Sequence, residues 1–160
     1  MKGIINILII LLLFLACDKK DKIVEDYIPV NSFEILYNDN IYMDSLRNEV
    51  IKNGNPESFE KLYEICISSA NTSEEFYFST IMAKKYNYPK AYYYLFIHTR
   101  YMDSKELDKM AVYYLLKSYE GNCEESKYAI MEIFKDKKIP KSSDYLMIQD
   151  TTKLVKIPTM

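Results

Sequence analysis

Helix-breaking residues recur in this chain at a nearly constant spacing. The motifs Gly54-Asn55-Pro56, Asn87-Tyr88-Pro89 and Gly121-Asn122-Cys123 begin at residues 54, 87 and 121, which gives spacings of 33 and 34 residues. Between the breakers, apolar residues recur at every third and fourth position, the period of an amphipathic helix. A repeat of this length accommodates two helices and a turn. The sequence therefore predicts an all-α chain, a short right-handed α-solenoid of about three helix-turn-helix repeats.

The composition favours the same fold. Three Gly and five Pro among 160 residues are too few for the many tight turns of an all-β chain. A hydrophobic fraction of 49% beside 28% charged residues is typical of a globular domain. The 21 basic and 23 acidic side chains leave no positive surplus for binding phosphates, so we expect no nucleic-acid partner.

The breakers divide the chain into seven predicted helices. Ser73 and Ser104 are the expected N-caps, and Gly54 and Gly121 stand where helices should end. The segment 22–40 shows no helical period and is predicted to be an extended linker. The predicted helices span residues 44–53, 56–69, 73–87, 89–102, 104–120, 124–137 and 142–149.

The N-terminal residues have the order of a secretory signal. A short positive segment, residues 1–3, precedes the apolar stretch 4–16, which is shorter than the about 20 residues needed to cross a bilayer. The run Leu-Phe-Leu-Ala-Cys at 13–17 resembles the lipobox of bacterial lipoproteins, although Phe14 stands where that pattern more often has Leu, Val or Ile. The resemblance implies that Cys17 is lipidated and that the protein is anchored to a membrane of the bacterial cell envelope, without indicating which one.

A second pattern begins at Lys109. A basic and a small residue precede an aromatic residue, and a Gly-Asn pair and a large aliphatic residue follow. These positions are Lys109, Ala111, Tyr114, Gly121, Asn122 and Ile130. The stretch resembles a Sel1-like repeat, a relative of the tetratricopeptide repeats, and the two preceding units match it faintly.

This resemblance covers about residues 41–150 and includes departures. The packing glycine of the family is replaced by Tyr63, Phe96 and Met131 in the three units. The expected division of the chain is a signal peptide at 1–16, a lipidated cysteine and linker at 17–40, a repeat domain at 41–150 and a C-terminal tail at 151–160.

The resemblance also implies where a partner would bind. In such repeats the first helix of each pair lines the concave surface, and Tyr and Arg are frequent interface anchors. The predicted partner-binding residues are Lys90, Tyr93, Ile97, Arg100, Tyr101, Tyr128, Glu132 and Lys135, and the same face includes Glu57, Glu60, Glu64 and Glu125. These stripes are equally compatible with an ordinary solvated surface.

The sequence contains no recognised catalytic motif: HExxH, GxSxG, GxxxxGK[ST] and GxGxxG are all missing. The single histidine, His98, falls on the inward stripe of its predicted helix and is interpreted as a structural imidazole. The pairs Glu74-Glu75 and Glu124-Glu125 begin helices, where acidic residues complement the helix dipole. We therefore predict a protein that is not an enzyme and has no cofactor.

Two cysteines remain besides Cys17. Cys66 and Cys123 lie in no metal-ligand spacing, so we expect no metal site. Both are interpreted as small buried residues, and the sequence leaves open whether they pair.

Together these features predict a membrane-anchored lipoprotein that acts as a non-catalytic protein-binding module, an envelope scaffold or assembly factor with a protein or peptide partner. One alternative is an immunity protein that neutralises an interbacterial toxin. The other is a small-ligand binder or an enzyme with an unrecognised site. That last function would require a deep pocket around His98 and a charged neighbour with a perturbed pKa.

Overall fold

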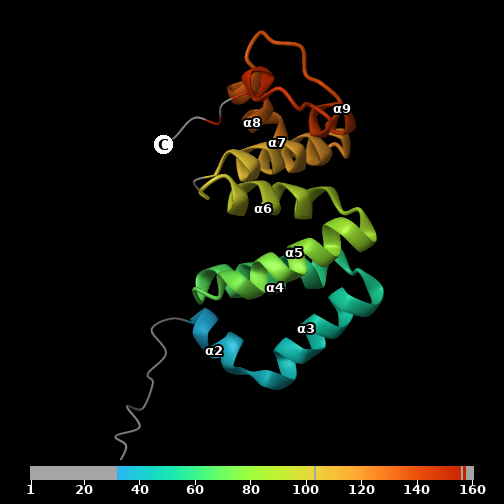
Figure 1. Ribbon diagram of the computed structural model, residues 1–160. Helices are drawn as coiled ribbons and strands as arrows, with labels where there is room; N and C mark the ends of the chain where they lie inside the picture. The colour runs from blue at the N-terminus through green and yellow to red at the C-terminus, as the bar shows by residue number, and fades with distance from the viewer. Residues whose placement is uncertain (1–31, 103, 156, 158–160) are drawn as a thin grey trace, which may run out of the picture.

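The computed structural model describes residues 32–102, 104–155 and 157, and every regular element in this part of the chain is helical (Figure 1). The helices are α2 (Ser32–Asn38), α3 (Asn40–Asn53), α4 (Pro56–Ser68), α5 (Thr72–Tyr86), α6 (Pro89–Thr99), α7 (Lys105–Glu120), α8 (Glu124–Phe134) and α9 (Ser142–Leu146), followed by the 3-10 helix η1 (Thr151–Lys153). The predicted all-α fold is confirmed.

The seven predicted helices are all present. Their starts agree with the prediction to within one residue, except that α3 begins four residues early, and their ends agree to within three. Gly54 ends α3 with a φ of 61°, and Gly121 ends α7. Ser104 is the N-cap residue of α7, as predicted. The prediction for Ser73 is wrong, because α5 has its N-cap at Asn71.

The segment before α3 also departs from the prediction. An extended linker is expected over 22–40, but Ser32–Asn38 form α2, which packs on α3 and α4. Phe33 and Tyr37 lie one turn apart and pack against the buried core. The Tyr37 hydroxyl also donates a hydrogen bond to Glu74 of α5 at 2.7 Å. These tertiary contacts stabilise a helix too short to form alone.

Other predicted segments lie at the chain ends. The signal peptide at 1–16, Cys17 and the linker up to residue 31 lie outside the described residues. Of the predicted tail, Leu154, Val155 and Ile157 pack against the core. Among the described helices, none combines the length and the apolar character that crossing a membrane requires.

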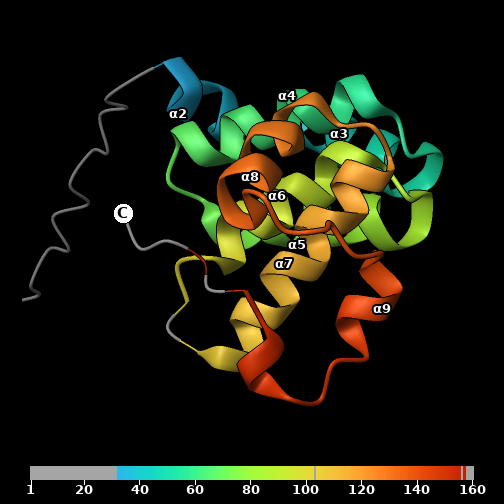
Figure 2. The same cartoon turned by 90° about the horizontal axis from the view of Figure 1, so that it is seen from above.

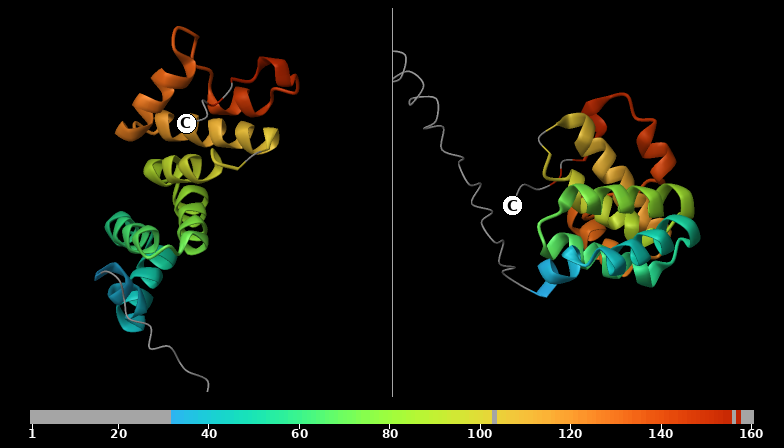
Figure 3. Two further views of the ribbon diagram at one scale, coloured as in Figure 1. Left: turned by 90° about the vertical axis from the view of Figure 1, so that its left-hand side faces the viewer. Right: turned by 90° about the horizontal axis from the view of Figure 1, so that it is seen from below.

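The helices form a stack of pairs that runs from α2 and α3 at one end to α8 and α9 at the other (Figures 1 and 3). From α2 to α8 each helix packs against the next, whereas α9 packs against α7 and does not contact α8. Contacts between α2 and α4, α3 and α5, α6 and α8, and α7 and α9 join helices further apart in the chain. Figure 2 looks along the stack and shows α9 beside α7. Among the described residues, no Cα atom of α4 comes within 8 Å of one in α6. These two helices are therefore joined through their side chains.

The buried core consists of two clusters that meet at α6. The first contains residues of α3, α4 and α5 together with Ala91, Tyr92 and Leu95 of α6. The second contains Phe96 of α6 and residues of α7, α8 and α9. Tyr114 of α7 packs against both clusters. The stack thus buries a continuous core that a single helix pair could not.

The turn at Gly54 allows a test of this packing. A Cβ atom there would lie 2.3 Å from Cδ1 of Tyr86, and the φ of 61° disfavours any L side chain. The Tyr86 ring is held in place because its hydroxyl donates a hydrogen bond to the Ile51 carbonyl at 2.7 Å. We expect Gly54→Ala to lower the free energy of unfolding by about 2 kcal/mol, measured by urea denaturation.

The double variant Gly54→Ala/Tyr86→Ala separates the two causes. Relative to Tyr86→Ala alone, the alanine at position 54 should cost only the backbone strain, about 1 kcal/mol. An unchanged unfolding midpoint for the single Gly54→Ala variant would contradict the close approach of Tyr86.

Candidate functional site

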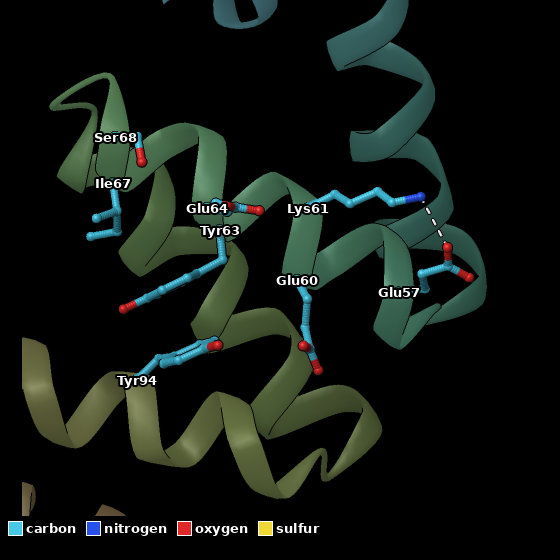
Figure 4. A pocket seen from close by; sticks show the side chains of 8 residues that line it. All are labelled: Glu57, Glu60, Lys61, Tyr63, Glu64, Ile67, Ser68 and Tyr94. Carbon is cyan, nitrogen blue, oxygen red and sulfur yellow. Dashed lines mark hydrogen bonds and ion pairs between the residues drawn. The ribbon is translucent and has the colours of Figure 1, made fainter. Parts of the chain in front are cut away.

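Two grooves lie on either side of α6. The α6–α8 groove has a volume of about 470 Å³ and is lined by Tyr93, Arg100, Glu124, Glu125, Tyr128, Ala129 and Glu132. The α4–α6 groove has a volume of about 630 Å³ and is lined by Glu57, Glu60, Lys61, Tyr63, Glu64, Ile67, Ser68 and Tyr94 (Figure 4). Both grooves belong to the first helices of successive pairs, which is where the sequence predicts a partner-binding face.

Four of the eight predicted partner-binding residues come together in the α6–α8 groove. Tyr93 lies on α6 and Arg100 directly follows it, whereas Tyr128 and Glu132 lie one turn apart on α8. Tyr128 is 75% exposed, a large fraction for an aromatic side chain. Tyr93 is half-buried, and burial raises the pKa of its hydroxyl.

The other four predicted residues have different positions. Lys90 lies in the first turn of α6, and its ammonium lies 2.8 Å from a Glu60 oxygen on α4 and 3.4 Å from a Glu125 oxygen on α8. Ile97 packs against the second core cluster, whereas Tyr101 and Lys135 are exposed. Of these four, Lys90 has the clearest structural role, because its ion pairs connect three successive first helices.

Arg100 is a free cation in the α6–α8 groove. Among the described residues, no carboxylate oxygen lies within ion-pair distance of its guanidinium group. The guanidinium carbon lies 5.2 Å from the centroid of the Phe96 ring and 5.4 Å from that of Tyr101. These cation–π contacts orient the side chain and leave its hydrogen-bond donors available for a ligand.

Glu125 supplies negative charge beside this cation. Hydrogen bonding from the Cys123 thiol at 3.0 Å, together with the charge of Lys90, lowers the pKa of Glu125. The groove therefore presents both signs of charge around a pair of tyrosines, which suits it to polar and aromatic protein contacts.

The α4–α6 groove has an aromatic floor. The rings of Tyr63 and Tyr94 stack with their centroids 3.5 Å apart and their planes 8° from parallel. At one side, Glu60 accepts hydrogen bonds from Tyr88 at 2.6 Å and from Lys90 at 2.8 Å. Burial opposes ionisation of Glu60, but the hydrogen bonds from Lys90 and Tyr88 outweigh it and lower the pKa.

Sequence reasoning missed a buried polar cluster between α5 and α6. The Glu75 side chain is only 1% exposed, and its Oε2 lies 3.1 Å from Nδ1 of His98. Its other oxygen accepts a hydrogen bond from Ser79 at 3.1 Å. Burial raises the pKa of Glu75, although His98 and Ser79 favour the carboxylate. The signal was present in the sequence, because Glu75 shares a helix face with Ser79 and the buried Met82.

This cluster meets only part of what a site at His98 requires. The charged neighbour with a perturbed pKa is present. However, neither His98 nor Glu75 lines one of the two grooves or the smaller pocket between α2 and the turn after α4. Ser79 is fully buried, and its hydroxyl bonds the carboxylate rather than the imidazole. This arrangement differs from that of a histidine-activated nucleophile.

The two remaining cysteines are buried and unpaired. Burial raises the pKa of Cys66 to about 12, which is typical of an inert structural thiol. Within the described ranges, no group of three or more His, Cys, Asp or Glu side chains is placed to hold a metal ion.

The chain matches no protein-family model, no curated protein sequence and no solved structure. The likeness to Sel1-like repeats and to a lipoprotein signal therefore stays a prediction from the sequence.

Proposed function

We propose that this chain is a bacterial envelope lipoprotein, anchored through Cys17, whose helical domain binds a protein or peptide partner without catalysis. The observation that carries the proposal is the α6–α8 groove, which brings Tyr93, Arg100 and Tyr128 together from two successive first helices. Tyr and Arg are the residues that most often anchor protein interfaces.

The exposed apolar surface of α8 supports a binding role. Tyr128 and Met131 are 75% and 60% exposed, although both are large apolar side chains. Exposed apolar groups surrounded by charges are typical of surfaces that bind other proteins. Arg100, which has cation–π contacts but no ion pair, would gain a carboxylate or carbonyl partner on binding.

The residues around the α6–α8 groove are fixed by their own contacts. Lys90 bridges Glu60 and Glu125, and Phe96, a fully buried residue of the second cluster, contacts the Arg100 guanidinium. A binding surface on packed helices keeps its shape before the partner arrives, which lowers the entropic cost of association. These features suit a scaffold or assembly factor of the envelope.

The membrane anchor is supported by the order of residues 1–17. Acyl chains on Cys17 would hold the domain at the membrane without a membrane-binding face in the fold itself. Cys17→Ser should abolish the incorporation of a labelled fatty acid into the protein, which gel electrophoresis of the labelled cells would detect.

The partner-binding role is tested by capture from detergent-solubilised envelopes, with the full chain as bait. We expect Arg100→Ala/Tyr128→Ala to recover at least about tenfold less partner than the wild type, because two interface anchors are lost. Tyr128 is a better probe than Tyr93, because the Tyr93 ring packs against the core at 6.0 Å from Phe96.

The matched control is Tyr77→Ala/Lys84→Ala on the exposed surface of α5. It removes one tyrosine and one cation outside both grooves and should leave recovery unchanged. Equal recovery by both double variants would overturn the assignment of the α6–α8 groove. Identification of the captured protein as a toxin would assign the binding role to immunity rather than to scaffolding.

A further inference from the structure

We propose that the α4–α6 groove is a second recognition site, which takes a lysine or arginine side chain of the partner between the Tyr63 ring and the Glu64 carboxylate. This inference rests on the proposed function, because it specifies the chemistry of a partner segment that extends from the α6–α8 groove across α6. The cation site involves other residues than the α6–α8 groove, so an experiment can contradict one of these two proposals and leave the other intact.

The tyrosine stack provides a rigid surface for a cation. Figure 4 shows the two rings stacked head to tail, with their hydroxyl groups at opposite ends. The fully buried Phe59 packs against both, with ring centroids 6.3 Å from Tyr63 and 5.9 Å from Tyr94. The face of Tyr63 that is turned away from Tyr94 lies below Ile67 and Glu64 and opens into the groove.

The chain already places one of its own cations beside this stack. The Lys90 ammonium lies 6.0 Å from the centroid of the Tyr94 ring while it binds Glu60. Tyr94 therefore has an internal cation and carboxylate on its side of the stack. Tyr63 lines the groove and is followed in the chain by Glu64, and among the described residues no cation lies over its ring. A partner cation would give Tyr63 the arrangement that Tyr94 already has.

The charges in the groove leave one carboxylate uncompensated. Glu57 pairs with Lys61 at 2.9 Å, and Glu60 pairs with Lys90. Lys61 extends toward Glu57 and away from Tyr63 (Figure 4). Within the described part of the chain, Glu64 has no ion-pair or hydrogen-bond partner, and its side chain is exposed.

A long cationic side chain fits these surroundings better than other groups. Its ammonium or guanidinium would meet the negative face of the Tyr63 ring and the Glu64 carboxylate together. Its alkyl stem would cover Ile67, which is 44% exposed. An acidic side chain would be repelled by Glu64, and a neutral one would leave that carboxylate without a partner.

The test uses defined peptides and the isotopically labelled full chain in detergent micelles. The probe is acetyl-Gly-Ser-Lys-Ser-Gly-amide, with matched peptides that carry Arg, Gln or Glu in place of Lys. We expect the Lys and Arg peptides to shift the backbone amide resonances of residues 63–67, and the Gln and Glu peptides to leave them in place.

Variants assign the binding to the two proposed groups. Glu64→Gln should weaken binding of the Lys peptide about fivefold, the effect of losing one exposed ion pair. Tyr63→Leu should weaken it similarly, whereas Tyr63→Phe keeps the ring and should bind like the wild type. Asp136→Asn, which neutralises an exposed carboxylate outside both grooves, is the matched charge control and should change nothing.

Equal shifts with the Gln peptide, no shift with any peptide, or wild-type affinity of Glu64→Gln would each overturn the cation site. The Arg100→Ala/Tyr128→Ala variant should bind the Lys peptide normally, because it leaves this groove intact. A captured partner that is lost with that variant but kept with Glu64→Gln would uphold the proposed function and overturn this inference.

Discussion

Replacing Ala91 by arginine is expected to unfold the domain. Ala91 is 0% exposed and lies in the first turn of α6, within the first core cluster and beside Tyr92. An arginine there would overpack the junction and bring an unpaired charge into the core, at a combined cost of about 5 kcal/mol. Domains of this size are stable by only about 5–15 kcal/mol. A thermal melt followed by circular dichroism should therefore show a much lower melting temperature, or no cooperative transition at all.

The same substitution at an exposed position provides the control. Met131 on α8 is 60% exposed, so Met131→Arg should change the free energy of unfolding by no more than about 0.5 kcal/mol. A melting curve of Ala91→Arg that overlays the wild type would mean that α6 turns a different face to the core.

The second large effect is expected at the buried pair between α5 and α6. His98→Ala would leave the Glu75 carboxylate with only the hydrogen bond from Ser79. An uncompensated charge at a site 1% exposed is costly, and we expect the free energy of unfolding at pH 7 to fall by about 3 kcal/mol. This expected loss lies at the low end of the range usual for broken buried ion pairs, because the His98 side chain is itself 23% exposed.

A double-mutant cycle separates the charge from the packing. In the background of Glu75→Gln no buried charge is left, so His98→Ala should then cost only the lost ring contacts, such as that with Phe76 at 4.7 Å. If His98→Ala costs the same in both backgrounds, the imidazole contributes by packing alone and the pair carries no coupling energy.

The pH dependence of stability provides an independent check on Glu75. Burial raises its pKa above the ordinary 4.5, so the folded state binds this proton more tightly than the unfolded state. The resulting stabilisation is fully present below pH 4.5 and is lost as the pH rises through the raised pKa. The stability of Glu75→Gln relative to the wild type should therefore increase with pH across that window, as measured by urea denaturation. A difference that stays flat or decreases would contradict the raised pKa.

The helices were predictable because their ends carry local signals. Pro56 and Pro89 begin helices, and Gly54 and Gly121 end them, so the boundaries follow from chain geometry at those residues. The helix α2 lacks such a signal. It has no buried residue and depends on contacts of Phe33 and Tyr37 with distant helices, which a local reading of 22–40 does not reveal.

The candidate site was predictable in part. Helical periodicity placed Tyr93 and Arg100 on one side of α6, and both line the α6–α8 groove. Ile97 follows the same spacing but packs into the second cluster, because α5, α7 and α8 all contact α6 and leave it a narrow exposed stripe. The pair of Glu75 and His98 was missed for two reasons. The partners lie 23 residues apart in the chain, and the helix dipole alone already explained a glutamate at the start of a helix.

The division of α6 between two core clusters bears on how this stack opens. Stacked repeats often fray from their ends, because each unit contacts only its neighbours. Here, among the described helices, α6 alone contributes buried residues to both clusters, so neither half can detach without exposing one side of it. The amide hydrogens of α6 should then exchange with solvent only when the whole domain opens, later than those of α2 or α9.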